Sequence, residues 1–153
     1  MNVSAFYFAY GSNMNRQRVA ARGLCIDDVR AATLDGVRVS FDKQSRDHPR
    51  CGHANLTFDR GSRTEGVLYR LRSDADVLRM DRYEATPINY SRDVVVVSSG
   101  GERFAAWTYF ANAAVTRAGL LPEREYLNHL LAGRPYLSAY YFDWLSRVRC
   151  IDD

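Results

Sequence analysis

The seven residues that decide the fold are Tyr7-Phe8-Ala9-Tyr10-Gly11-Ser12-Asn13. A short aromatic run that is closed by glycine is typical of a buried strand entering a turn. Asn13 is a favourable N-cap, and the residues from Met14 to Arg22 include strong helix formers that end before Gly23. The pattern therefore predicts a strand, a glycine turn and a helix in direct succession.

The turn at Gly11 is a candidate binding site. Where a strand feeds the start of a helix, backbone N–H groups converge at the positive end of the helix dipole, and they can bind a carboxylate or an oxyanion. Glycine permits close approach of the backbone, and the flanking Tyr7 and Tyr10 are placed to wall a small pocket. An ordinary strand-to-helix turn explains the same residues, because most helix N-termini bind no ligand.

Outward from this stretch, the chain alternates between strand and helix patterns. Strict alternation predicts half-buried strands at residues 37–42 and 54–59, and further strands are expected at 64–71, 94–97 and 104–110, with 94–97 as an interior strand. Helices are expected from Ser73 to Glu84, from Pro122 to Ala132, and after Ser138. The prediction is one α+β domain over residues 1–153, a small mixed β-barrel of about six strands with outer helices.

Composition narrows the class of protein. The 153 residues are 46% hydrophobic and 25% charged, which suits a single folded domain with a real core. No apolar stretch approaches the roughly 20 residues that cross a bilayer, so no membrane partner is expected. The 20 arginines and one lysine are interspersed with acids, which argues against nucleic acid as a partner.

The chain termini and the cysteines bear on localisation. Residues 1–4 have no basic region ahead of an apolar run, so no secretory signal is expected and a cytoplasmic location is favoured. Cys25, Cys51 and Cys150 are odd in number and lack a CxxC spacing, which predicts reduced thiols rather than a disulfide framework.

Glu84 is the second candidate site residue. It follows a predicted helix and precedes a strand beginning near Tyr90, among aromatic and apolar neighbours. Burial there would raise its pKa and let it exchange protons near neutrality. A solvated carboxylate at a helix end is the simpler interpretation of the same residue. Glu65 is the rival acid, although acids in the middle of a strand usually face water.

The segment from Asp47 to His53 holds two imidazoles and a thiol, at His48, His53 and Cys51. No second cluster supplies a fourth zinc ligand, so no metal site is expected, and a polar loop is favoured over a cysteine nucleophile with a histidine base. Ser12 lacks the GxSxG context of a serine hydrolase.

Three segments resemble the γ-glutamylcyclotransferase family: Phe8-Ala9-Tyr10-Gly11-Ser12-Asn13-Met14, Glu65-Gly66-Val67-Leu68-Tyr69 and Met80-Asp81-Arg82-Tyr83-Glu84. Their order and spacing match, and the likeness covers most of the chain. The resemblance implies a small β-barrel with outer helices and a reaction without a cofactor. In that reaction, the α-amine of a γ-glutamyl compound attacks its own γ-carbonyl and releases 5-oxoproline and an amine.

The resemblance also implies residue roles. Glu84 falls on the family's catalytic glutamate, where it would carry a proton from the attacking amine to the departing nitrogen. Tyr90 and Tyr109 correspond to tyrosines near the pocket. Ala85 stands where a glycine usually follows the glutamate, which is a departure from the family pattern. The substrate loop is formed by Tyr7, Phe8, Ala9, Tyr10, Gly11, Ser12 and Asn13.

The expected function is the conversion of a small γ-glutamyl amide or γ-glutamyl amino acid to 5-oxoproline and a free amine. Two alternatives stay open: a cyclotransferase specialised for γ-glutamylamines or for a γ-glutamyl-protected natural-product intermediate, and a small-anion binding module without turnover. The partner is expected to be a small-molecule γ-glutamyl substrate. The aromatic run Tyr140, Tyr141 and Phe142 fits either a contact surface, as in a homodimer, or a core helix.

Overall fold

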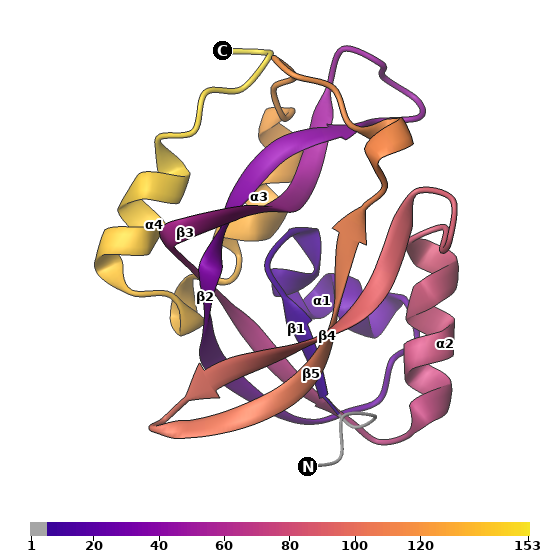
Figure 1. The fold of residues 1–153 in the computed structure, drawn as a ribbon, viewed down its shortest axis with the longest axis vertical. Coiled ribbons are helices and arrows are strands. Elements are labelled where there is room, and N and C mark those ends of the chain that lie inside the picture. Colours follow the sequence, from indigo (N-terminus) through magenta and orange to yellow (C-terminus); the bar gives the residue numbers. More distant parts are fainter. Residues whose placement is uncertain (1–5) are drawn as a thin grey trace.

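The computed structural model describes residues 6–153 as a barrel of strands flanked by helices (Figure 1). Residues 1–4, on which the expectation about a secretory signal rests, lie outside the described residues. The elements, in chain order, are β1 (Phe6–Ala9), η1 (Ser12–Met14), α1 (Arg16–Ala21), β2 (Ile26–Gln44), β3 (Gly52–Leu71), α2 (Asp74–Tyr83), β4 (Tyr90–Ser99), β5 (Glu102–Ala111), η2 (Ala113–Val115), α3 (Arg124–Leu131), η3 (Arg134–Tyr136) and α4 (Ala139–Ser146).

The five strands close into a barrel in the order β1-β3-β2-β4-β5. All neighbouring pairs are antiparallel except β1 and β5, which are parallel and paired at Tyr7 and Trp107. The seam between β2 and β4 is equally narrow, with Thr33 opposite Ser98. The prediction of an α+β mixed barrel is therefore confirmed, with five strands in place of about six.

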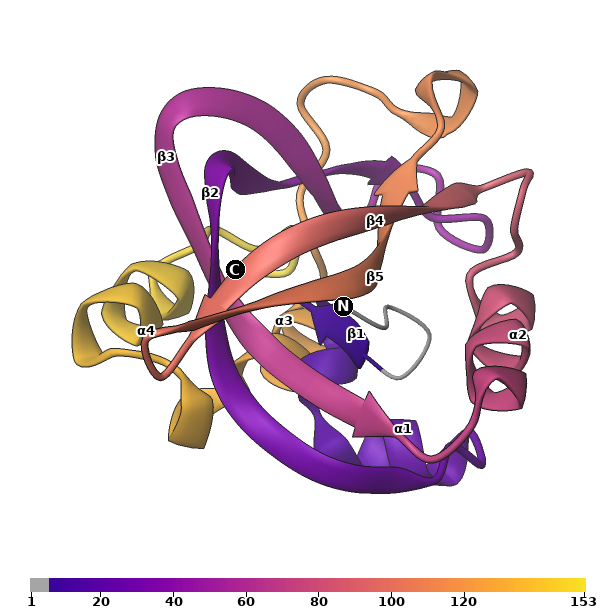
Figure 2. The same ribbon diagram turned by 60° about the horizontal axis from the view of Figure 1, so that its bottom comes forward.

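The strand count differs because β3 is continuous. The sequence predicted separate strands at 54–59 and 64–71. Instead, the pairing with β2 changes register between the Asp35–Arg63 pair and the Val37–Phe58 pair, so the intervening residues of β3 are accommodated as a bulge. Figure 2 shows β2 and β3 running side by side through a strong bend.

Gly66 lets the N-terminal strand approach β3 closely. A Cβ atom added at Gly66 would lie 2.3 Å from the carbonyl oxygen of Ala9, closer than packing allows. Ala9 is the last residue of β1, and it pairs with Val67. The glycine therefore fixes where the chain enters the turn at Gly11.

The helix after this turn is shorter than predicted, and the expectation that Asn13 caps it is wrong. Residues 12–14 form a 3-10 turn, and α1 begins only at Arg16. Its cap is Asn15, whose side-chain oxygen accepts a hydrogen bond from the Gln17 N–H at 3.1 Å. The Asn13 side chain is instead drawn into buried tertiary contacts, described below.

The predicted caps of two later helices are confirmed. Ser73 accepts a hydrogen bond from the N–H of Ala75 at the start of α2, and Ser138 accepts one from Tyr141 at the start of α4. In both views α2 lies on the side of the barrel opposite α4 (Figures 1 and 2). Within residues 6–153, none of the helices has the length and apolar content that crossing a membrane requires.

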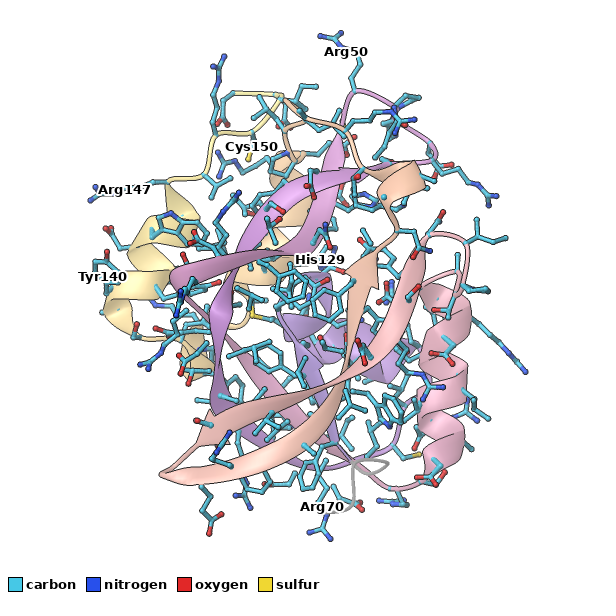
Figure 3. All side chains as sticks on the ribbon, viewed as in Figure 1. Arg50, Arg70, His129, Tyr140, Arg147 and Cys150 are labelled. Carbon is cyan, nitrogen blue, oxygen red and sulfur yellow. The ribbon has the colours of Figure 1, made fainter. Side chains whose placement is uncertain are left out.

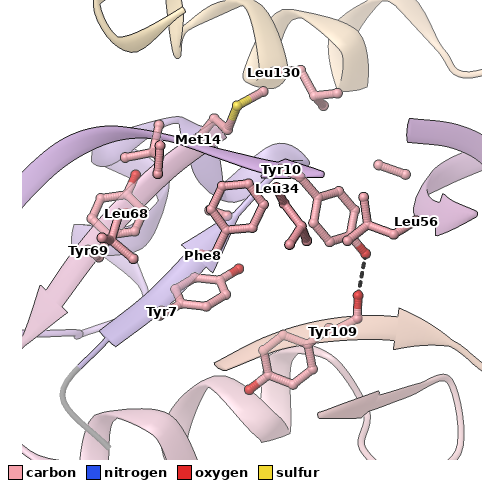
Figure 4. Packing of buried hydrophobic residues seen from close by; sticks show 14 of the residues in the cluster. Tyr7, Phe8, Tyr10, Met14, Leu34, Leu56, Leu68, Tyr69, Tyr109 and Leu130 are labelled. Carbon is pink, nitrogen blue, oxygen red and sulfur yellow. Dashed lines mark hydrogen bonds between the residues drawn. The ribbon is translucent and has the colours of Figure 1, made fainter. Parts of the chain in front are cut away.

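The core fills the barrel and continues beneath the outer helices. Aromatic rings of Phe8 and Tyr69 pack there with Leu68, while Met14 and Leu130 join it from the helices (Figure 4). The expectation that 94–97 is an interior strand is wrong. Val94 and Val96 are 41% and 44% exposed, because β4 presents one face to solvent and the alternate Val97 to the core.

Candidate active site

A cavity opens where the end of β1, the end of α2 and the barrel interior meet. Its empty space, the open mouth included, is about 310 Å³. The walls are largely aromatic, with one carboxylate. The lining residues are Tyr7, Tyr10, Gly11, Ser12, Asn13, Ala54, Glu84, Tyr90, Tyr109 and Tyr126.

Glu84 reaches the cavity from the C-terminal end of α2, where its backbone N–H donates to the carbonyl of Met80 at 3.1 Å. Burial raises the pKa of its carboxyl group above the usual range. Nearby positive charges, led by Arg22, and a hydrogen bond from Asn13 act in the opposite direction without cancelling the effect of burial. A carboxylate in this setting is a stronger base than one in water.

Asn13 connects the turn to this carboxylate. Its Nδ2 donates to Glu84 Oε1 at 3.2 Å, to the Tyr7 hydroxyl at 3.0 Å and to the sulfur of Met80 at 3.3 Å. Its Oδ1 accepts from Arg22 Nη1 at 2.8 Å. With only 3% of its surface exposed, Asn13 is held in one orientation and fixes the Glu84 carboxylate in turn.

Tyrosine hydroxyls on the cavity walls are anchored by the backbone. Tyr10 donates to the carbonyl of Tyr109 at 2.6 Å (Figure 4), and Tyr90 donates to the carbonyl of Ala54 at 2.9 Å. Tyr126 accepts from the N–H of Ala54 at 2.9 Å. These bonds satisfy the buried hydroxyls and stiffen the walls.

Tyr109 differs, because its hydroxyl donates to a carboxylate, Asp81 Oδ1, at 2.7 Å. Asp81 also forms an ion pair with Arg92 at 3.1 Å. The acid is thus occupied by two partners and lies outside the cavity lining, which leaves Glu84 as the acid that faces the site.

The turn contributes its backbone to the same cavity. Gly11 precedes the 3-10 turn, and its carbonyl accepts from the N–H of Met14 at 3.0 Å. The first N–H groups of such a turn have no partners within it, which suits them to bind an anionic oxygen. Tyr69 supports the turn from below by donating to the carbonyl of Asn13 at 2.6 Å.

The structure brings together most of the residues that the sequence singled out. Phe8 and Ala9 are the exceptions, because they are almost completely buried in the core and are absent from the cavity walls. Ala54 and Tyr126 line the cavity but were missed. The neighbouring sequence marks neither of them as a cavity residue, since Tyr126 fits the pattern of an ordinary residue in a C-terminal helix.

The rival candidates lie elsewhere. Glu65 accepts two hydrogen bonds at 2.7 Å from Ser138, one from its N–H and one from its hydroxyl, and so fixes the start of α4. Cys51 donates to Glu123 at 3.3 Å, and burial raises the pKa of its thiol, which disfavours a thiolate nucleophile. His53 stacks on Tyr126, with ring centroids 4.4 Å apart.

The three cysteines form no disulfide bonds, as the sequence predicted. Among the described residues, the side chains close enough to share a metal ion are Cys150, Asp152 and Asp153, and the last is already bonded to Arg124 at 2.7 Å. None of these three residues lines the cavity.

The surface is mixed in charge. Arg50, Arg70 and Arg147 extend from different edges of the molecule (Figure 3). Tyr140 points outward from α4 and is 86% exposed, whereas Tyr141 is buried at 7%. The aromatic run is therefore divided between surface and core, and a homodimer through this helix stays a prediction.

Comparison with known proteins assigns the family. The chain matches the family described as "Gamma-glutamyl cyclotransferase, AIG2-like" over residues 7–128, and it belongs to that family. It is 30% identical over 146 residues to YkqA of Bacillus subtilis (strain 168), which is provisionally named a gamma-glutamylcyclotransferase. The match covers 93% of this chain and 51% of YkqA, so the chain spans about half the length of that relative.

Solved structures share the fold. The crystal structure of YkqA superposes with a TM-score of 0.83 at 28% identity, covering 94% of this chain and 53% of that one. A structure titled "Gamma-glutamyl cyclotransferase" gives 0.84 at 19% identity, and an uncharacterised human protein gives 0.83 at 20%. Each of these two covers 97% of this chain and 90% of the other.

Proposed function

We propose that this protein is a γ-glutamyl cyclotransferase that converts a small γ-glutamyl amide or γ-glutamyl amino acid to 5-oxoproline and a free amine. The observation that carries the proposal is the junction of Glu84 with the Gly11 turn. The two line one cavity, and Asn13 links them at 3.2 Å from the carboxylate. Family membership supports the same reaction.

The turn binds the substrate in this mechanism. Nucleophile and electrophile belong to one molecule, so the site needs only to fold the glutamyl chain into its ring-closing shape. The N–H groups of Gly11, Ser12 and Asn13 hold the α-carboxylate or the oxyanion that develops on the γ-carbonyl oxygen. The tyrosine walls exclude water and restrict the chain to compact shapes.

Glu84 moves the proton. As the α-amine forms its bond to the γ-carbon, the carboxylate takes a proton from the attacking nitrogen. It then gives that proton to the departing nitrogen while the original amide bond breaks, so the glutamate returns to its ionised form. Such a relay contributes roughly 10²–10⁴-fold. The reaction is an internal transfer, and it requires no cofactor or second substrate.

The test is turnover of a panel of γ-glutamyl amides, followed by mass spectrometry for 5-oxoproline and the released amine. Glu84→Gln keeps the shape of the side chain and its oxygen acceptor for Asn13 but cannot take a proton, so it should lose at least two orders of magnitude in kcat. Glu65→Gln is the matched control, because that acid anchors α4 and lies outside the cavity.

The outcomes separate the alternatives. Release of both products by the wild type and by Glu65→Gln, with loss in Glu84→Gln, supports the proposal. Binding of 5-oxoproline without any turnover would instead identify a binding module. Activity confined to γ-glutamylamines would select the specialised cyclotransferase, and near-normal turnover by Glu84→Gln would remove Glu84 from the mechanism.

A further inference from the structure

Lys43 is the single lysine of the chain, and it is buried. It lies on β2 opposite His53 of β3, and only 5% of its surface is exposed. None of the ion pairs within residues 6–153 includes its ammonium group. An ammonium group in such surroundings is costly unless a partner compensates it.

The ammonium group lies beside the cavity. Lys43 Nζ is 5.7 Å from the centre of the Tyr90 ring, and Tyr90 is one of the lining residues. The opposite residue, His53, stacks on Tyr126, another lining residue. Lys43 itself does not line the cavity, so its charge lies just beyond the space that surrounds Glu84.

Burial lowers the pKa of the Lys43 ammonium group, and the negative charge of Glu84 opposes that shift. Arg18 approaches the same walls, and its Nε is buried without a hydrogen-bond partner among the described residues. Burial, with the positive charges of Lys43 and Arg18, lowers the pKa of His53 to about 4, so the imidazole is neutral at pH 7. The acids that act on Lys43 are Glu84, which the mechanism uses, and the exposed Asp47.

We infer that Lys43 is a specificity-determining residue whose positive charge, from behind the Tyr90 wall, attracts a carboxylate on the leaving amine, so that γ-glutamyl amino acids and peptides are preferred to γ-glutamylamines. This inference rests on the proposed function. The glutamyl part of every substrate must occupy the space between Glu84 and the Gly11 turn, whereas the leaving group extends beyond it. A cation outside the lining therefore acts on the leaving group, which is the part that differs between substrates.

The test uses two ligands that differ by one carboxylate: γ-glutamyl-alanine and γ-glutamyl-ethylamide. The variant is Lys43→Met, which keeps the packed stem and removes the charge. Arg46→Gln is the matched control, because it removes a neighbouring positive charge that is exposed. Turnover is measured for each protein, and calorimetric binding of both ligands is measured with the same substitutions on the Glu84→Gln background.

In Lys43→Met, kcat/KM for γ-glutamyl-alanine should fall about 10- to 100-fold, as expected when an opposite charge several ångströms away is removed. The kcat/KM for γ-glutamyl-ethylamide should change less than about threefold. In Arg46→Gln, the preference for γ-glutamyl-alanine over γ-glutamyl-ethylamide should be the same as in the wild type. Binding on the Glu84→Gln background should show the same selective loss.

Equal losses for both ligands, or no loss for either, would overturn the inference. Equal losses with a displaced pH profile would make Lys43 a group that tunes Glu84 instead. If the wild type cyclises neither ligand, the proposed function fails. The inference then stands only if binding still favours γ-glutamyl-alanine and Lys43→Met abolishes that preference; absence of binding by both ligands overturns it.

Discussion

Replacing Asn13 with alanine removes the link between the turn and the carboxylate. The substitution deletes the bonds to Glu84, to the Tyr7 hydroxyl and from Arg22, at 3.2, 3.0 and 2.8 Å. Bonds to charged groups contribute about 1.5–3 kcal/mol each and neutral ones about 1 kcal/mol, but the half-buried Arg22 can recover water. The expected loss of unfolding free energy is therefore about 2–4 kcal/mol, which thermal denaturation measures as a fall in Tm of roughly 5–15 °C.

Asn13→Ala should also change the pH dependence of activity. The hydrogen bond from Asn13 lowers the pKa of Glu84, so its removal raises that pKa further. Because the ionised form is the base, the rising limb of kcat/KM against pH should move about one to two pH units toward alkaline values. The position of this rising limb is measured from kcat/KM for γ-glutamyl-alanine over a series of pH values.

Asn15→Ala is the matched control. It removes the N-cap of α1, at a cost of about 0.5–2 kcal/mol, without touching Glu84. Its pH limb should coincide with that of the wild type. If Asn13→Ala leaves the limb unmoved, or if both variants move it equally, Asn13 does not orient the carboxylate and the reasoning fails.

Three further predictions concern the same site. Because burial raises the folded-state pKa of Glu84, its ionised form destabilises the fold at neutral pH, so Glu84→Gln should raise Tm at pH 7 and lose this gain near pH 3; a lower Tm at pH 7 would contradict the electrostatics. Ala85 has a φ of 48°, so Ala85→Gly should add about 0.5–1 kcal/mol of stability in denaturant titrations with kcat unchanged, and a loss of stability would argue against backbone strain. Tyr109→Phe loses one bond to Asp81, which Arg92 still pairs, so thermal unfolding should show a cost of about 0.5–1.5 kcal/mol and kinetics a loss of kcat below tenfold. A larger loss of kcat would place the Tyr109 hydroxyl in the proton transfer.

The sequence predicted those parts of the site that depend on local signals. Residue spacing predicts both the aromatic strand before Gly11 and the capped helix that ends at Glu84, because caps and turns depend on residues only a few positions apart. These two segments already hold the turn and the acid of the proposed reaction.

What the sequence did not predict depends on contacts between distant segments. Asn13 has the local preference of an N-cap, yet its bonds to Tyr7 and Glu84 prevail in the folded chain. Tyr126 enters the wall only because its side chain reaches β3, where its hydroxyl accepts from the N–H of Ala54 and its ring stacks on His53. The merging of two predicted strands into β3 has the same origin, since pairing with β2 continues on both sides of residues 60–63.

The cavity draws its walls from residues scattered between Tyr7 and Tyr126, and the barrel is closed by the narrow pairing of Tyr7 with Trp107. No fragment from either half of the chain contains a complete site. During synthesis on the ribosome, the pocket can form only after α3 has emerged, although the β2–β3 hairpin can pair much earlier. Recovery of ligand binding in a refolding experiment should therefore require the docking of α3 as well as the closure of the barrel, and lag behind the gain of β structure.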